Sequence, residues 1–377
     1  MPHTDEPSLR AAADDWGHLV HHRPRAVARP STEEEVVAVL ADAERRGLPF
    51  AVRGQGHNTT GAAQCGGGLV VETGGLRAVH HLGADSVTVD AGIRWSDLLR
   101  ATLPHGLAPP VLTDYLELSV GGTLSVGGIG GATHRHGLQT DNVLSLRVRT
   151  PGGEVRDCSA EQDAELFDAV RAGHGRHGLI LRATLRLVPA PRRVRHVQHA
   201  YTDLAEFLAD QRELVASGEY DHVEGMAVPG EDGTSWQYLL DTAVRAPEGE
   251  DYFEFLDAMA PQEARLRASG AWSHPHPWTN TFLPDSAADE VITETTTALS
   301  PDDVGAADGG LVLLYPFPTS VVATPGVRMP AEPVAFLFAL LRTAPADDPA
   351  ALARMLDGNR RLRERVLAAG GTPYLEP

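Results

Sequence analysis

The chain has 377 residues, of which 42% are hydrophobic and 22% charged, so it is long enough for two domains with ordinary cores. Its 51 acidic residues outnumber 32 basic ones, and the net charge of −19 argues against nucleic-acid binding because phosphate backbones are repelled. Lysine is absent, which excludes Schiff-base chemistry and the lysine-dependent phosphate sites of P-loop proteins and kinases.

Two cysteines, Cys65 and Cys158, allow at most one disulfide, so the chain does not require an oxidising compartment. The acidic N-terminus lacks the basic and apolar regions of a signal peptide. No apolar run approaches the ~20 residues that span a membrane. We expect a cytoplasmic protein without membrane contact.

The first half of the chain alternates short strands, helices and glycine-rich loops. Ser31 and Glu34 predict a capping box for a helix that ends at Gly47. A hairpin-like turn is expected at 151–153. Further strands are expected at 50–52, 68–72, 86–91, 143–150 and 179–188, and helices at 95–103 and 164–171.

The segment 189–193, rich in proline and arginine, predicts a domain junction. We therefore expect one domain over 1–192 and a second, α+β domain over 193–377. In the second domain, helices are expected at 204–215, 252–268, 333–341 and 349–369, and strands near 223–228, 236–241 and 311–315. The predicted fold class is α+β.

A GxGxxG pattern occurs at Gly173, Gly175 and Gly178. A helix precedes this loop and a strand follows it, which reverses the order of a Rossmann dinucleotide site. These glycines are better explained by a tight helix-to-strand turn or by close approach of the backbone to a flat ligand.

The loop 52–58 (VRGQGHN) and the segment 118–137 contain glycine at high density. Successive glycines expose backbone N–H groups that bind a pyrophosphate without lysine, and this places His57 beside the ligand. The alternatives are a loop-capping role for His57 and a flexible surface loop at 118–137. Asp114 lies between Leu112 and Leu116, so it is either a base with a raised pKa or a solvated aspartate.

Metal and nucleophile motifs are weak. The histidines occur in pairs, but no HExxH or cysteine-rich pattern accompanies them, so no metal is predicted. No GxSxG nucleophile elbow is present. The histidine pairs are His21/His22, His80/His81, His134/His136, His174/His177 and His274/His276.

In combination, these motifs resemble those of the cytokinin dehydrogenases, which belong to the vanillyl-alcohol-oxidase (PCMH-type) FAD flavoproteins. The resemblance runs from about Trp16 to Pro377. It implies a PCMH-type FAD-binding domain followed by an α+β substrate domain. The stretches that carry it are HLVHHRPRAVARPST, VRGQGHNTTGAAQ, LTDYLELSVGGTLSVGGIGG, RHGLQTDNVLSL, CSAEQDAELFDAVRAGHGRHGLI and HPHPWTNTFLP.

The resemblance implies FAD bound covalently through His57, with no cysteine positioned for a second link. It implies Asp114 as the catalytic acid/base and Asp241 as a second, substrate-binding carboxylate. Trp278 and Asn280 match residues of the substrate domain that approach the flavin. The remaining implied FAD-binding residues are Arg53, Gly54, Gln55, Gly56, Asn58, Gly121, Gly122, Thr123, Ser125 and Ile180.

The implied reaction is oxidation of the C–N bond of an N-alkyl amine, a cytokinin such as isopentenyladenine. Hydride passes to flavin N5, the imine is hydrolysed to an amine and an aldehyde, and oxygen or a quinone-like acceptor takes the electrons. Departures from the family are Gln55 and Asn58, a shorter substrate domain, and a last FAD-domain segment that is missing after Tyr374. The alternatives are a related FAD enzyme that acts on an alcohol or natural-product intermediate, and a non-catalytic flavin-binding remnant.

Overall fold

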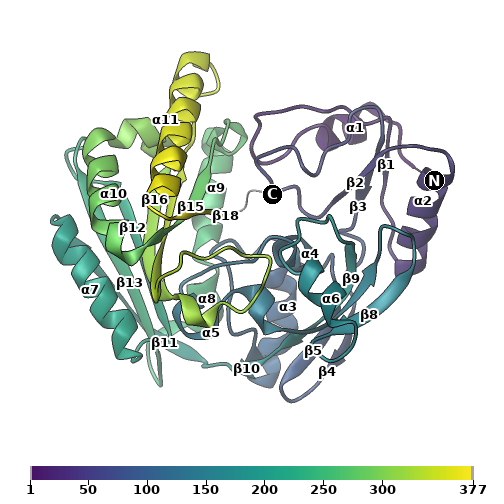
Figure 1. Ribbon diagram of the computed structural model, residues 1–377, viewed down its shortest axis with the longest axis horizontal. Coiled ribbons are helices and arrows are strands. Elements are labelled where there is room, and N and C mark those ends of the chain that lie inside the picture. Colours follow the sequence, from purple (N-terminus) through teal and green to yellow (C-terminus); the bar gives the residue numbers. More distant parts are fainter. Residues whose placement is uncertain (1, 375–377) are drawn as a thin grey trace.

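The computed structural model describes residues 2–374, and Figure 1 shows two groups of sheets side by side. The described strands form sheets of three, two, five and eight strands. Every strand before residue 190 belongs to the three smaller sheets, and every strand from residue 193 belongs to the eight-stranded sheet. The predicted α+β class is confirmed. The domain boundary at 192/193 stays a prediction, and the expected missing segment after Tyr374 lies outside the described residues.

The N-terminal part contains the three smaller sheets. Its three-stranded sheet is parallel, in the order β1-β3-β2, and its five-stranded sheet has the order β4-β5-β9-β7-β8. The elements are α1 (Glu6–Ala12), β1 (Ala26–Ala28), α2 (Glu33–Arg45), β2 (Phe50–Arg53), β3 (Leu69–Glu72), β4 (Val79–Leu82), β5 (Ser86–Asp90), α3 (Trp95–Thr102), β6 (Leu107–Ala108), α4 (Val120–Leu124), α5 (Thr133–His136), β7 (Val143–Arg149), β8 (Val155–Ser159), α6 (Ala164–Val170), β9 (Leu179–Arg186) and β10 (Val188–Pro189).

Helix α2 covers the parallel sheet with its apolar residues Val36 and Leu40. Its cap lies one residue later than predicted: the Thr32 hydroxyl accepts a hydrogen bond from Glu35 N, and Glu35 accepts one from Ser31 N. The Ser31/Glu34 capping box is therefore wrong. Because serine, threonine and glutamate follow one another here, the sequence pattern fits two registers equally well.

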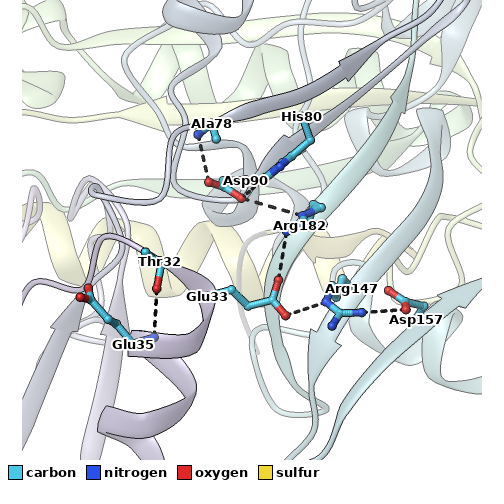
Figure 2. A network of polar contacts seen from close by, with 9 residues as sticks. All are labelled: Thr32, Glu33, Glu35, Ala78, His80, Asp90, Arg147, Asp157 and Arg182. Carbon is cyan, nitrogen blue, oxygen red and sulfur yellow. Dashed lines mark hydrogen bonds and ion pairs between the residues drawn. The ribbon is translucent and has the colours of Figure 1, made fainter.

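Charged side chains tie α2 to the five-stranded sheet (Figure 2). The Glu33 carboxylate lies 2.6 Å from Arg147 Nε and 3.3 Å from Arg182 Nη2. Arg182 also approaches Asp90, whose carboxylate contacts His80 Nε2 at 2.6 Å. Each of these carboxylates thus has a cationic or hydrogen-bonding partner on a neighbouring element.

The large sheet has the strand order β14-β11-β13-β12-β16-β17-β15-β18 and is antiparallel at each recorded pairing. Helices α7, α10 and α11 bury their apolar residues against one face, and the opposite face turns toward the N-terminal part (Figure 1). The elements are β11 (Arg193–Tyr201), α7 (Leu204–Ser217), β12 (His222–Pro229), β13 (Trp236–Ala246), β14 (Glu250–Asp251), α8 (Tyr252–Leu256), α9 (Met259–Ser269), β15 (Thr279–Pro284), α10 (Asp285–Ala298), β16 (Leu311–Pro318), β17 (Val334–Leu341), α11 (Pro349–Ala368) and β18 (Thr372–Tyr374).

Two sequence expectations in this part are wrong, and some elements were not predicted. The helix expected at 333–341 is strand β17, because a short, wholly apolar run fits a buried strand as well as a helix. The helix expected at 252–268 is divided into α8 and α9. Strand β11, which begins at the end of the predicted junction, was not predicted. Strand β15 and helix α10 were not predicted either.

The two cysteines are free, Cys158 being buried and Cys65 partly buried. The turn at Gly173–Gly178 does connect α6 to β9, as expected, with Gly175 at φ +73°. Among residues 2–374, no helix is both long and apolar enough to cross a bilayer.

Candidate active site

A cavity of about 1230 Å³ lies between the N-terminal part and the large sheet. It exceeds the roughly 300–1,000 Å³ of ordinary small-molecule pockets, so it has room for a dinucleotide together with a substrate. Of the predicted site residues, only Arg53 does not line it. The lining residues from that set are Gly54, Gln55, Gly56, His57, Asn58, Asp114, Gly121, Gly122, Thr123, Ser125, Ile180, Asp241, Trp278 and Asn280.

The loop after β2 presents free backbone donors to this cavity. Within residues 2–374, the backbone N–H groups of residues 55–59 have no hydrogen-bond acceptor. Gly56 has φ +72°, and a Cβ there would lie 2.1 Å from Arg53 Nη2. Arg53 donates to Asp14 O behind the loop, so its side chain supports the loop rather than lining the site. Five successive free N–H groups suit an anionic group such as a pyrophosphate.

His57 projects from this loop into a group of aromatic rings. Its ring centroid lies 4.6 Å from that of Trp16 and 5.7 Å from that of Trp278. Burial, with a smaller contribution from His276, lowers the pKa of His57 to about 3. The imidazole is therefore neutral at physiological pH and keeps one nitrogen lone pair available as a nucleophile.

Asp114 meets a second carboxyl group, that of Glu224 on β12. The two buried groups interact electrostatically, and each shifts the pKa of the other. Burial and then the negative charge of Glu224 raise the pKa of Asp114 well above its usual range, and burial raises the pKa of Glu224 to about 7. Because both pKa values are raised, the pair retains a proton near neutral pH and can accept or donate one there.

Asp241 lies directly across the strand pairing from Glu224 and also faces the cavity. Its Oδ1 is 2.7 Å from His196 Nε2 and accepts a hydrogen bond from Gln198 Nε2 at 3.1 Å. Glu224, rather than Asp241, is therefore the carboxyl group that acts on the pKa of Asp114. A role for Asp241 in substrate binding stays a prediction.

Sequence reasoning did not find Glu224 or its neighbours. The available signal was a charged residue within the otherwise apolar strand 223–228, since a carboxylate on the buried face of a strand needs a reason. His222 Nε2 lies 3.4 Å from Glu224 Oε2, and burial lowers the pKa of His222 to about 4. Tyr315 on β16 also lines the cavity, and burial raises its pKa.

The described residues 2–374 contain no group of three or more histidine, cysteine, aspartate or glutamate side chains placed to hold a metal ion. The cavity instead combines free backbone donors, a neutral imidazole and a proton-sharing carboxyl pair. This set fits an anionic organic cofactor beside a substrate that carries an N–H or O–H group.

Comparisons with known proteins agree with this description. The family model described as "FAD binding domain" matches residues 24–159, and that described as "Cytokinin dehydrogenase 1, FAD and cytokinin binding" matches residues 237–371. The chain is 41% identical to an uncharacterised oxidoreductase, ORF5 in the fasciation locus of Rhodococcoides fascians, over 99% of this chain and 89% of that protein. It is 35% identical to cytokinin dehydrogenase 10 of Oryza sativa subsp. japonica, over 91% of this chain and 74% of that protein.

The fold is shared with a solved structure of 6-hydroxy-D-nicotine oxidase from Arthrobacter nicotinovorans. The TM-score is 0.73 at 21% identity, over 98% of this chain and 86% of that one. The predicted PCMH-type FAD-binding fold with an additional substrate-binding part is thus confirmed. The chain belongs to the cytokinin dehydrogenase family and is an FAD-dependent oxidoreductase.

Proposed function

We propose that this protein oxidises the C–N bond of an N-alkyl amine of the cytokinin type, such as isopentenyladenine. The observation that carries the proposal is the buried Asp114–Glu224 carboxyl pair, which faces the same cavity as the glycine loop around His57. The names of the rice relatives support this choice of substrate.

The residues present fit FAD. The free N–H groups of residues 55–59 would hold its pyrophosphate, and Gly121, Ser125 and Ile180 would contact the remainder of the cofactor. Bound FAD supplies a two-electron acceptor for hydride.

The carboxyl pair would bind the substrate nitrogen. In its singly ionised form, the pair accepts a hydrogen bond from the substrate N–H, and Asp114 is the proposed base when the retained proton lies on Glu224. As hydride leaves the carbon next to that nitrogen, positive charge grows on the nitrogen and the carboxylate stabilises it. The product is an imine, which water converts to an amine and an aldehyde. Oxygen or a quinone-like compound is the proposed final electron acceptor.

We further propose that His57 forms a covalent bond to the flavin. The neutral imidazole and the free lone pair support this link, because a protonated imidazole is not a nucleophile. Neither cysteine lines the cavity, which supports a single bond.

Two measurements test the proposal. The visible spectrum of acid-precipitated protein should show flavin that stays on the chain in wild type and is lost in His57→Ala. Anaerobic mixing with isopentenyladenine should bleach the flavin band faster than mixing with a panel of primary alcohols. Faster bleaching by an alcohol would replace the amine with that alcohol as the substrate class, and no bleaching by any compound would indicate a non-catalytic flavoprotein.

A further inference from the structure

The orientation of the His57 ring is fixed by stacking rather than by hydrogen bonds. Among residues 2–374, no group hydrogen-bonds to either ring nitrogen. The ring instead lies nearly parallel to the Trp16 indole, at an interplanar angle of 17°. Functional histidines are usually oriented by a hydrogen bond to the nitrogen that does not react. In this protein, stacking on the face of the Trp16 indole orients the His57 ring in place of such a hydrogen bond.

Trp16 belongs to a short segment, residues 14–18, that follows the His57 loop closely; we call it the N-terminal strap. Trp16 N donates to Gly56 O at 2.9 Å, and Gly17 N donates to Asn58 O at 2.9 Å. These two bonds lie on either side of His57. The strap is therefore fixed to the two residues that flank the histidine in the sequence.

The strap is itself held rigidly. The buried Asp15 carboxylate accepts hydrogen bonds from Gly17 N at 3.1 Å and from Gly61 N at 2.8 Å. A Cβ on Gly17 would lie 2.6 Å from Thr59 Cα, so only glycine permits this approach. The position of the indole is consequently determined by the backbone and not only by side-chain packing.

The other face of the indole is covered by His276, from the large-sheet part. The two rings lie 3.9 Å apart at 9°, and His276 N donates to Gly17 O at 2.8 Å. His276 is 2% exposed, and its Nε2 and the Trp16 Nε1 have no partner among the described residues. Trp16 is thus clamped between two imidazoles, one from each part of the molecule, beside the cavity.

We propose that Trp16 is a positioning residue for His57, and that the N-terminal strap couples the loop bearing His276 to the histidine that links the flavin. The inference rests on the proposed covalent bond. Trp16 makes no hydrogen bond to either ring nitrogen of His57, so it acts by holding the imidazole plane toward the cavity.

The test compares a variant that keeps a flat ring with one that keeps only apolar bulk. Trp16→Phe should retain nearly all acid-stable flavin, whereas Trp16→Leu should form the covalent bond about 10-fold more slowly, the scale of a lost ring stack. Total flavin is measured in the same samples as acid-stable flavin, because weaker FAD binding would lower total and acid-stable flavin together. Trp236 provides the matched control, since its indole donates to Thr296 O and Leu299 O away from the cavity.

Trp236→Leu should leave the covalent fraction at the wild-type level. If Trp16→Leu links flavin as fast as wild type, the positioning role is overturned. If wild type itself binds FAD without a covalent bond, the proposed link fails, and NMR titration of labelled histidine in the full chain then decides the inference. His57 should begin to titrate between about pH 5 and 8 in Trp16→Leu but not in Trp16→Phe, because water reaches an unstacked imidazole. Identical titration in both variants would overturn it.

Discussion

Two groups of carboxylates in this protein differ in their partners: one group has cationic partners, and the other is a pair of carboxyl groups. In the network of Figure 2, Glu33 contacts Arg147 and Arg182, and Asp90 contacts His80. In the cavity, Asp114 and Glu224 act on one another's pKa, and no arginine hydrogen-bonds to either within residues 2–374. A carboxylate with an arginine partner holds elements together, whereas a buried pair without one retains a proton that it can exchange.

The amino-acid composition adds to this difference between the two groups of carboxylates. Every strong cation in this chain is an arginine, and its planar guanidinium forms fixed, bidentate contacts. Arginine contacts join α2 to the five-stranded sheet. The Asp114–Glu224 interaction instead joins the N-terminal part to β12, and the raised pKa values of both groups keep a proton on the pair.

The largest expected effect is on Asp114. Asp114→Asn should lower kcat/KM for amine oxidation by at least ~100-fold, since the amide cannot take a proton. Flavin content should not change, because Asp114 is not among the residues proposed to hold FAD. Stopped-flow bleaching and the visible spectrum measure the two quantities separately. Unaltered turnover would remove Asp114 from the mechanism. The buried pair would then no longer differ in function from carboxylates such as Asp90, which only hold elements together.

The arginine network should respond in stability and not in rate. Arg147→Leu removes the contacts of one guanidinium with Glu33 and Asp157, and should lower the free energy of unfolding by about 2 kcal/mol. Urea unfolding measures this loss. Arg45→Leu, which removes an exposed contact to Asp42, is the matched control and should cost little. Equal losses in the two variants would mean that the network behaves as ordinary surface pairs.

A smaller effect is expected from Glu224. Burial and proton sharing place the pKa of Glu224 at about 7, so kcat/KM of wild type should fall as the pH is lowered through this region. Glu224→Gln removes a negative charge that raises the pKa of Asp114. The fall in kcat/KM on the acid side of the pH profile (the acid limb) should therefore move to lower pH. Asp241→Asn should move it in the same direction by less, since Asp241 is the smallest of the causes that act on the pKa of Glu224. A limb that stays in place in Glu224→Gln would show that the pair does not control catalysis.

The extent to which sequence predicts this site depends on how local each feature is. The His57 loop and Asp114 were found because glycine spacing and an isolated acid are visible within a few residues. Glu224 and Trp16 were missed because each acts through a partner that is distant in the sequence, and only the folded chain brings them together. Strand β17 was mistaken for a helix for a related reason. Its run VAFLFALL is buried on both faces, so neither the helical nor the strand period appears in it.

The last prediction tests the comparison with one kind of substitution in both groups. Burial raises the pKa of Glu224 to about 7, so the stability that its protonated form contributes is complete below about pH 4.5 and is lost as the pH rises through 7. Glutamine cannot ionise, so Glu224→Gln should gain stability over wild type between pH 5 and pH 8, by about 1–2 kcal/mol. Glu33→Gln should instead lose stability at pH 8, because Arg147 and Arg182 then face an uncharged amide. Thermal unfolding of the two variants at both pH values gives the signs. Opposite signs at pH 8 follow if arginine contacts stabilise the Glu33 carboxylate while burial disfavours that of Glu224, and equal signs would remove that distinction.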